Sequence, residues 1–189
     1  VVGTDRNPQA PAFKEADESL ICSTRDAEET VIAVKKYAES HPVHGVMTVA
    51  NDVPLTVARV AQELGLPGIP PDCAKLAANK ISMKQRFNKA EVATPAYQVF
   101  STKLEFLKVY DKRGIPKILK PSDGRGSRGV LFLDGSTDPD WAWDESYSHS
   151  ENGELMLEDY APGPQLSVEG LMLNDKYHAV AFADRNYSN

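Results

Sequence analysis

Residues 116–130 read PKILKPSDGRGSRGV and carry the strongest structural signal in the chain. The expected apolar strand ends at Lys120. A turn with three glycines in six residues follows, and a second strand begins near Val130. Glycines let successive backbone N–H groups point into one concavity, which suits phosphate oxygens. Lys120 would add a positive charge and Ser127 a hydroxyl donor. The segment predicts a phosphate-binding loop, and the alternative is a glycine-rich β-hairpin with a solvated lysine.

This loop is not a Walker P-loop, because its lysine comes before the glycines and no helix follows. Two other segments of the chain are candidates for a functional role. Basic side chains crowd residues 75–89, a pattern that on its own indicates the solvated face of a helix. Residues 154–164 form an apolar strand that runs into two acidic residues and a Pro-Gly-Pro turn. This third segment is either an ordinary strand end or a hinge whose backbone groups bond to an adenine edge.

The first 70 residues alternate between strand and helix signals. Short strands are expected over residues 19–23 and 44–50. Thr24 or Asp26 can cap the helix after the first, and Pro54 suits the first turn of the next helix. Strands separated by helices of this length indicate parallel βαβ units.

From residue 72 onward the pattern changes. Residues 72–92 are expected to be helical throughout. Strands are then expected over 97–100, 115–120, 130–133, 155–160, 165–173 and 177–183, and helices over 103–112 and 138–150. The dipeptide Asn174-Asp175 predicts a hairpin turn between the last two strands. The fold class is therefore α/β followed by α+β, with a boundary near residues 70–90.

Composition limits the classes of protein. The 189 residues are 41% hydrophobic and 25% charged, as in an average globular protein. No apolar run approaches the roughly 18 residues of a membrane-spanning helix. The net charge of −6 argues against general nucleic-acid binding, although it leaves room for a local basic pocket.

Cysteines and histidines indicate no metal or nucleophile site. Cys22 and Cys73 are too few for a disulfide framework, and both are expected to be small buried hydrophobes in a reducing compartment. The histidines show neither metal-ligand nor catalytic-triad spacing; they are His41, His44, His149 and His178.

Four segments in order resemble the ATP-grasp superfamily, most of all its carbamoyl-phosphate synthase large-chain and biotin carboxylase branch. They are Asn79-Lys80, Ile118–Val130, Leu157–Tyr160 and Ser167–Gly170. Residues 1–72 resemble the α/β domain that precedes the ATP-grasp domain in this family. The resemblance implies that this domain lacks its first strand here. Residues 73–189 then begin the ATP-grasp domain itself, with a small lid subdomain over about 93–160, truncated at the C-terminus.

The resemblance implies an ATP site with two phosphate-binding lysines, a glycine flap, an adenine hinge and two polar residues beyond it. In that order these are Lys80 and Lys120; Gly124, Gly126, Ser127 and Gly129; Glu158, Asp159, Tyr160 and Ala161; and Gln165 and Glu169. Gln165 stands where several relatives have a glutamate that bonds the ribose, but an amide can also bond a hydroxyl. Asn51 and Asp52 are expected on the substrate side.

The implied reaction is ATP-dependent ligation of a small carboxylate to an amine or related nucleophile, through an acylphosphate. The resemblance further implies a cytoplasmic protein with no nucleic-acid or membrane partner, and Mg²⁺ ligands beyond Asn189. No catalytic residue is assigned. The chain is expected to be a fragment that binds ATP weakly, is inactive alone and can self-associate through exposed strand edges. The alternative is a nucleotide-sensing or interaction module without ligase activity.

Overall fold

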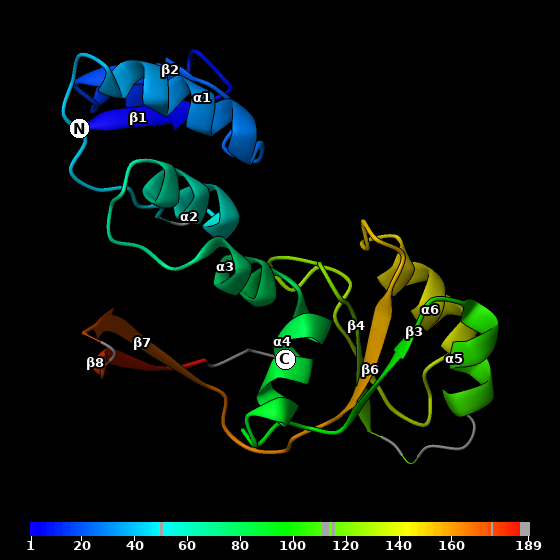
Figure 1. The fold of residues 1–189 in the computed structure, drawn as a ribbon. Coiled ribbons are helices and arrows are strands. Elements are labelled where there is room, and N and C mark those ends of the chain that lie inside the picture. The colour runs from blue at the N-terminus through cyan, green and yellow to red at the C-terminus, as the bar shows by residue number, and fades with distance from the viewer. Residues whose placement is uncertain (50, 111–113, 115, 175, 186–189) are drawn as a thin grey trace.

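The computed structural model describes residues 1–49, 51–110, 114, 116–174 and 176–185, arranged around three small sheets (Figure 1). A parallel pair lies near the N-terminus, a four-stranded antiparallel sheet has the order β3-β6-β4-β5, and an antiparallel pair lies near the C-terminus. Strands and helices alternate in the first part and antiparallel strands prevail in the second, as the sequence predicts.

The N-terminal unit joins two strands to two helices. Its elements are β1 (Val2–Asp5), the 3₁₀ helix η1 (Pro11–Lys14), β2 (Glu18–Ile21), α1 (Ala27–Ala38) and α2 (Pro54–Glu63). The Asp26 carboxylate caps α1 by accepting the Glu29 N–H at 3.0 Å, which confirms one of the two predicted caps. Pro54 occupies the first turn of α2, also as predicted. Val31, Val34 and Val60 pack between the two helices.

The strand predicted over residues 44–50 is wrong for the described residues 44–49, which form no strand. Met47 and Val49 are 78% and 75% exposed, and only Val46 packs against the cluster between α1 and α2. An apolar run signals burial, but a strand also needs a neighbour to bond its N–H and C=O groups. Gly45 weakens the segment further, because it has no side chain to pack. Residue 50 lies outside the described residues.

The single helix predicted over residues 72–92 is two helices, α3 (Pro71–Ala78) and α4 (Lys80–Lys89). Asn79 between them is extended, with φ −118° and ψ 116°, and its side chain accepts the Ser82 N–H at 2.9 Å. Asparagine favours this capping position, so one residue is enough to end one helix and begin another. Cys73, in the first turn of α3, is exposed, so its predicted burial is wrong, whereas the predicted burial of Cys22 is confirmed.

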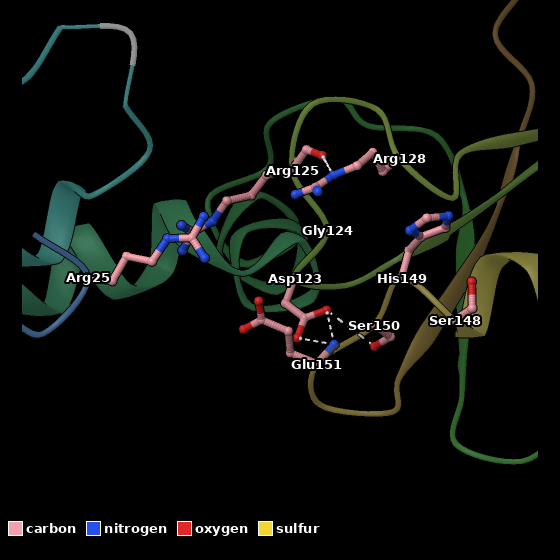
Figure 2. Close-up of a pocket in the computed structure, with 9 residues that line it drawn as sticks. All are labelled: Arg25, Asp123, Gly124, Arg125, Arg128, Ser148, His149, Ser150 and Glu151. Carbon is pink, nitrogen blue, oxygen red and sulfur yellow. Dashed lines mark hydrogen bonds between the residues drawn. The ribbon is translucent and has the colours of Figure 1, made fainter. Parts of the chain in front are cut away.

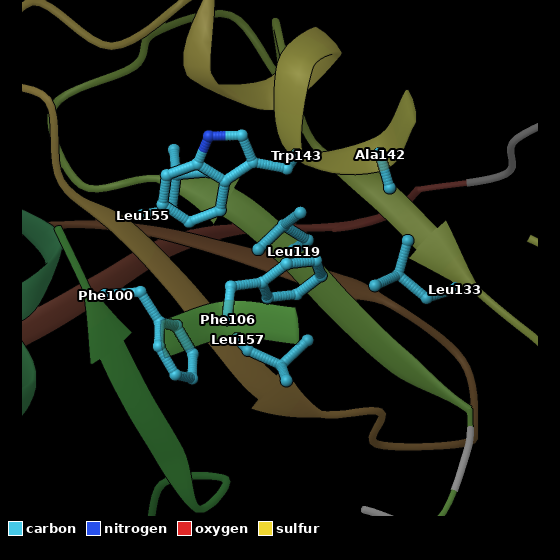
Figure 3. Close-up of a cluster of buried hydrophobic side chains, with 8 residues drawn as sticks. All are labelled: Phe100, Phe106, Leu119, Leu133, Ala142, Trp143, Leu155 and Leu157. Atoms are coloured by element: carbon cyan, nitrogen blue, oxygen red, sulfur yellow. The ribbon is translucent and has the colours of Figure 1, made fainter. Parts of the chain in front are cut away.

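The four-stranded sheet contains the main core (Figure 3). Its strands are β3 (Tyr97–Phe100), β4 (Lys117–Pro121), β5 (Leu131–Leu133) and β6 (Leu155–Asp159), and its helices are α5 (Lys103–Tyr110) and α6 (Pro139–Tyr147). Both helices cover one face of the sheet, where Phe106 and Trp143 pack on Leu119 and Leu157. These elements follow the prediction; the predicted positions 111, 112 and 115 lie outside the described residues.

Successive side chains along each strand point to opposite faces of the sheet, so only every second residue faces this core. Leu119 pairs with Leu157 on the core side. The neighbouring register pairs, Ile118 with Glu158 and Lys120 with Met156, therefore point to the other side. The sheet thus holds a complete apolar core on one face and presents a lysine and a glutamate on the other.

The C-terminal strands β7 (Leu166–Leu173) and β8 (Lys176–Asp184) form an antiparallel hairpin, as predicted. Asn174 in the turn has φ +50°, whereas Asp175 lies outside the described residues. Most side chains of the hairpin are exposed. In the described parts of the chain, no helix is both long and apolar enough to cross a membrane.

Candidate functional site

Two lysines converge on Glu158 on the face of the four-stranded sheet opposite the aromatic core. Lys120 Nζ from β4 lies 2.5 Å from Glu158 Oε1, and Lys84 Nζ from α4 lies 2.7 Å from Glu158 Oε2. Lys84 also donates to Thr94 Oγ1 at 2.8 Å and to the Pro95 carbonyl at 3.2 Å. Lys84 and Glu158 are only 6% and 8% exposed. The carboxylate is therefore buried between two positive charges.

Sequence reasoning missed the role of Lys84. It treated the basic residues of 75–89 as a solvated helix face, which is correct for the exposed Lys75, Arg86 and Lys89. Lys84 lies on α4 with Arg86 and Lys89, but its side chain is directed toward the sheet. Its carboxylate partner is far away in sequence, so no local spacing could have revealed the pair.

Lys80, at the start of α4, connects the helix to the glycine-rich loop. Its backbone N–H donates to the Ser122 carbonyl at 2.9 Å, and its Nζ donates to the Gly124 carbonyl. Burial lowers the pKa of Lys80, and the nearby charge of Lys120 lowers this pKa further. Within the described residues, Lys80 forms no ion pair. The positive charge of Lys120, which itself pairs with Glu158, thus acts on the Lys80 ammonium.

The glycine-rich loop contains backbone conformations that favour glycine. Gly126 and Gly129 have φ of +62° and +67°, and Ser127 between them has φ +57°. The Ser146 hydroxyl donates to the Gly129 carbonyl at 2.8 Å and fixes the end of the loop to α6. The predicted loop residues Gly124, Gly126, Ser127 and Gly129 therefore form one turn between β4 and β5.

A second set of hydrogen bonds anchors the start of this loop (Figure 2). The Asp123 carboxylate accepts from the backbone N–H groups of Glu151 and Asn152, at 3.1 and 2.9 Å, and from the Ser150 hydroxyl at 3.2 Å. The hydrogen bonds of Asp123 therefore join the start of the loop to the turn before β6.

Gly129→Ala is expected to lower the free energy of unfolding by about 2–4 kcal/mol, because it combines backbone strain with overpacking. An added Cβ would lie 2.9 Å from the His149 Cβ and 3.0 Å from the Pro121 side chain. Urea unfolding measures the loss. Gly126→Ala is the matched control, because Gly126 has a similar φ but nothing within 4 Å of its Cβ position. Equal losses in the two variants would contradict the packing argument.

The predicted hinge residues are divided between the two faces of the sheet. Asp159 lies on the side opposite Lys120, where its carboxylate is 2.5 Å from Lys117 Nζ. Tyr160 packs edge-on against Phe132, with ring centroids 5.0 Å apart and both rings about half-exposed. Ala161 is exposed. An accessible aromatic pair therefore adjoins the strand end where an adenine hinge is predicted.

The remaining predicted residues lie apart from the lysines. Gln165 and Glu169 are exposed near or on β7, and among the described residues neither bonds to a lysine of the site. Asn51 donates to Thr24 Oγ1 at 3.3 Å. Asp52 lines a pocket beside the loop, and its charge opposes the lowering of the Lys80 pKa.

Within the described residues, no group of three or more histidine, cysteine, aspartate or glutamate side chains could hold a metal ion. That this segment supplies no metal ligand stays a prediction. The location of any Mg²⁺ ligands beyond Asn189 stays a prediction.

Comparisons with known proteins agree with this geometry. Residues 1–68 match the ATP-grasp N-terminal domain family. The ATP-grasp enzyme fsqD of Aspergillus fumigatus is 32% identical over 149 residues, which cover 78% of this chain and 24% of that protein. Alanine–anticapsin ligase of Bacillus subtilis is 27% identical, over 84% of this chain and 38% of that protein.

Among solved structures, an ADP complex of N5-carboxyaminoimidazole ribonucleotide synthetase has the same fold, with a TM-score of 0.77 and 17% identity. It matches all of this chain, which covers 48% of it. These comparisons support the resemblance to the ATP-grasp superfamily, whose N-terminal domain model matches residues 1–68. The chain spans about a quarter to two fifths of the length of the curated relatives it matches. The resemblance to the superfamily is confirmed, whereas the carbamoyl-phosphate synthase and biotin carboxylase branch stays a prediction.

Proposed function

We propose that this chain is the ATP-binding part of an ATP-dependent ligase that joins a small carboxylate to an amine or a related nucleophile through an acylphosphate. The observation that carries the proposal is the pair Lys80 and Lys120 beside the glycine-rich loop, with the pKa of Lys80 lowered by burial and by Lys120. Two neighbouring ammonium groups on a glycine-rich turn suit the phosphates of a nucleotide. Relatives named as ligases support this reading over a nucleotide sensor.

The residues present fit ATP in three places. Lys80 and Lys120 would bind and neutralise phosphate oxygens, and the loop from Gly124 to Gly129 would cover them and keep water away. The rings of Phe132 and Tyr160 offer a surface for an adenine at the strand end. When bound, ATP supplies the phosphoryl group that activates the carboxylate.

Several finer assignments form part of this proposal. Residues 1–72 would be the domain before the ATP-grasp domain, and 73–189 its nucleotide-binding beginning, with the lid over about 93–160. Glu158, Asp159, Tyr160 and Ala161 would be hinge residues, Gln165 would bond the ribose, and Glu169 would be a further acidic residue of the nucleotide site. Mg²⁺ dependence and a cytoplasmic location belong to the same proposal.

Lys120→Ala is expected to weaken ATP binding about tenfold to hundredfold, because it removes a charge-assisted bond to phosphate. Calorimetric titration of the 189-residue chain with ATP, with and without Mg²⁺, measures the change. Lys108→Ala is the control, because Lys108 is an exposed residue of α5 on the far side of the sheet. Circular dichroism checks that both variants fold, and Lys80→Ala provides a second test of the same site. Unchanged affinity in Lys80→Ala and Lys120→Ala, or no ATP binding by the folded chain, would contradict the proposal.

A further inference from the structure

A pocket lies between the N-terminal unit and the glycine-rich loop (Figure 2). Two adjoining hollows share Arg25, which precedes α1, and Asp123, Arg125 and Glu151 from the loop and the turn beside it. The second hollow extends along the start of α2 and reaches Asn79. Neither Lys120 nor Glu158 lines this pocket, and the ATP assignment gives no role to Arg25 or Arg125.

The arginines are the unusual feature of the pocket. Arg25 and Arg125 extend toward each other from opposite sides (Figure 2). In the part of the chain that the structure describes, neither guanidinium has an ion-pair or hydrogen-bond partner. Like charges that converge across a hollow repel each other, and an anion between them removes that cost. The net charge of the chain is −6, so this positive region is local rather than general.

Carboxylates also line the pocket and limit where an anion can bind. The Asp123 carboxylate is already engaged by two backbone N–H groups and the Ser150 hydroxyl. Asp52 lines the second hollow, and Glu151 lines both hollows together with the two arginines. An anionic group would therefore bind directly between Arg25 and Arg125 and would be disfavoured beside Asp52 and Glu151.

The pocket is continuous with the phosphate-binding lysines. Asn79 lines it, and the next residue is Lys80, whose ammonium bonds to the Gly124 carbonyl. Gly124 in turn lines the first hollow. A small molecule in the pocket could thus place one end near the bound phosphates and the other between the arginines.

We propose that the acid substrate carries a second anionic group, a carboxylate or a phosphate, and that Arg25 and Arg125 bind this group. The inference rests on the proposed function and names the class of its substrate. The planar guanidinium groups can each donate two parallel N–H bonds to such a group. The carboxylate that reacts would remain free to face the lysine side of the pocket. Arg25 would select acids with two anionic groups over simple acids.

The test compares three probes on the 189-residue chain at constant ionic strength, by chemical-shift titration. Acetate has one anionic group, succinate has a second carboxylate and 2-phosphoglycolate has a phosphate. We expect succinate or 2-phosphoglycolate to bind about tenfold more tightly than acetate, and the tighter of the two identifies the second group. Arg25→Gln should remove this advantage. Arg6→Gln, which removes an exposed arginine outside the pocket, should keep it.

Equal binding of all three probes, no binding of any probe, or an advantage that survives Arg25→Gln would overturn the proposal. ATP titrations on the same samples separate it from the nucleotide assignment. Loss of ATP binding with an Arg25-dependent preference for diacids would refute the ATP site and retain the anion site. Normal ATP binding without that preference would refute the anion site and retain the ATP site.

Discussion

Lys84→Met is expected to lower the free energy of unfolding by about 3 kcal/mol, the cost of breaking a buried ion pair from one side. The substitution keeps most of the side-chain volume but removes the charge that faces Glu158 Oε2 at 2.7 Å. Thr94 Oγ1 and the Pro95 carbonyl also lose their donor. Urea unfolding followed by circular dichroism measures the loss of stability.

Lys89→Met is the matched control, because Lys89 is an exposed residue at the end of the same helix. It should change stability by no more than about 0.5 kcal/mol. The double variant Lys84→Met with Glu158→Gln should be no more stable than Lys84→Met alone, since Glu158→Gln also removes the carboxylate that pairs with Lys120. If Lys84→Met behaved like the control, the ion pair would not contribute to the fold.

Phe106→Ala is expected to cost about 3–5 kcal/mol, because it opens a cavity in the core between the sheet and its two helices. Phe106 is fully buried, and its ring packs against those of Phe100, Tyr110 and Trp143 with centroids 5.6–5.8 Å apart. Urea unfolding followed by tryptophan fluorescence reports on this core directly, since Trp143 is part of it.

Leu104→Ala serves as the control for this second substitution. Leu104 lies on the same helix but is 62% exposed, so its loss should be within about 0.5 kcal/mol. A similarly small effect at Phe106 would show that the core can close around the missing ring.

Local signals in the sequence were enough to predict most elements of the second half. Leu155, Met156 and Leu157 form a short apolar run that ends in acidic residues and a Pro-Gly-Pro turn, and such a bounded run predicts a buried strand from local sequence. Asp26 and Pro54 predicted helix starts because capping depends only on adjacent residues. The glycines around Arg125 predicted a loop for the same reason.

The features that were missed depend on residues far apart in the chain. Residues 44–49 have an apolar composition, but whether they form a strand depends on a partner strand. Lys84 looks like any other basic residue of α4 until the sheet brings Glu158 beside it. Arg25 and Arg125 are 100 positions apart, and only the folded chain places both in one pocket. Asn79 is the exception, since its capping preference was available but was hidden within a helical pattern.

Ser122 links Lys80 and Lys120, the two lysines that we propose bind phosphate, through the backbone. Its carbonyl accepts the Lys80 N–H at 2.9 Å, its N–H donates to the Glu154 carbonyl at 3.0 Å, and it lies two residues after Lys120. Its buried hydroxyl also bonds to Asn152. The main-chain positions of both lysines are therefore set before any ligand arrives. Folding therefore already orders the backbone at both lysines, so that part of the conformational entropy is lost before binding. Ligand binding would then order only the lysine side chains and the glycine turn.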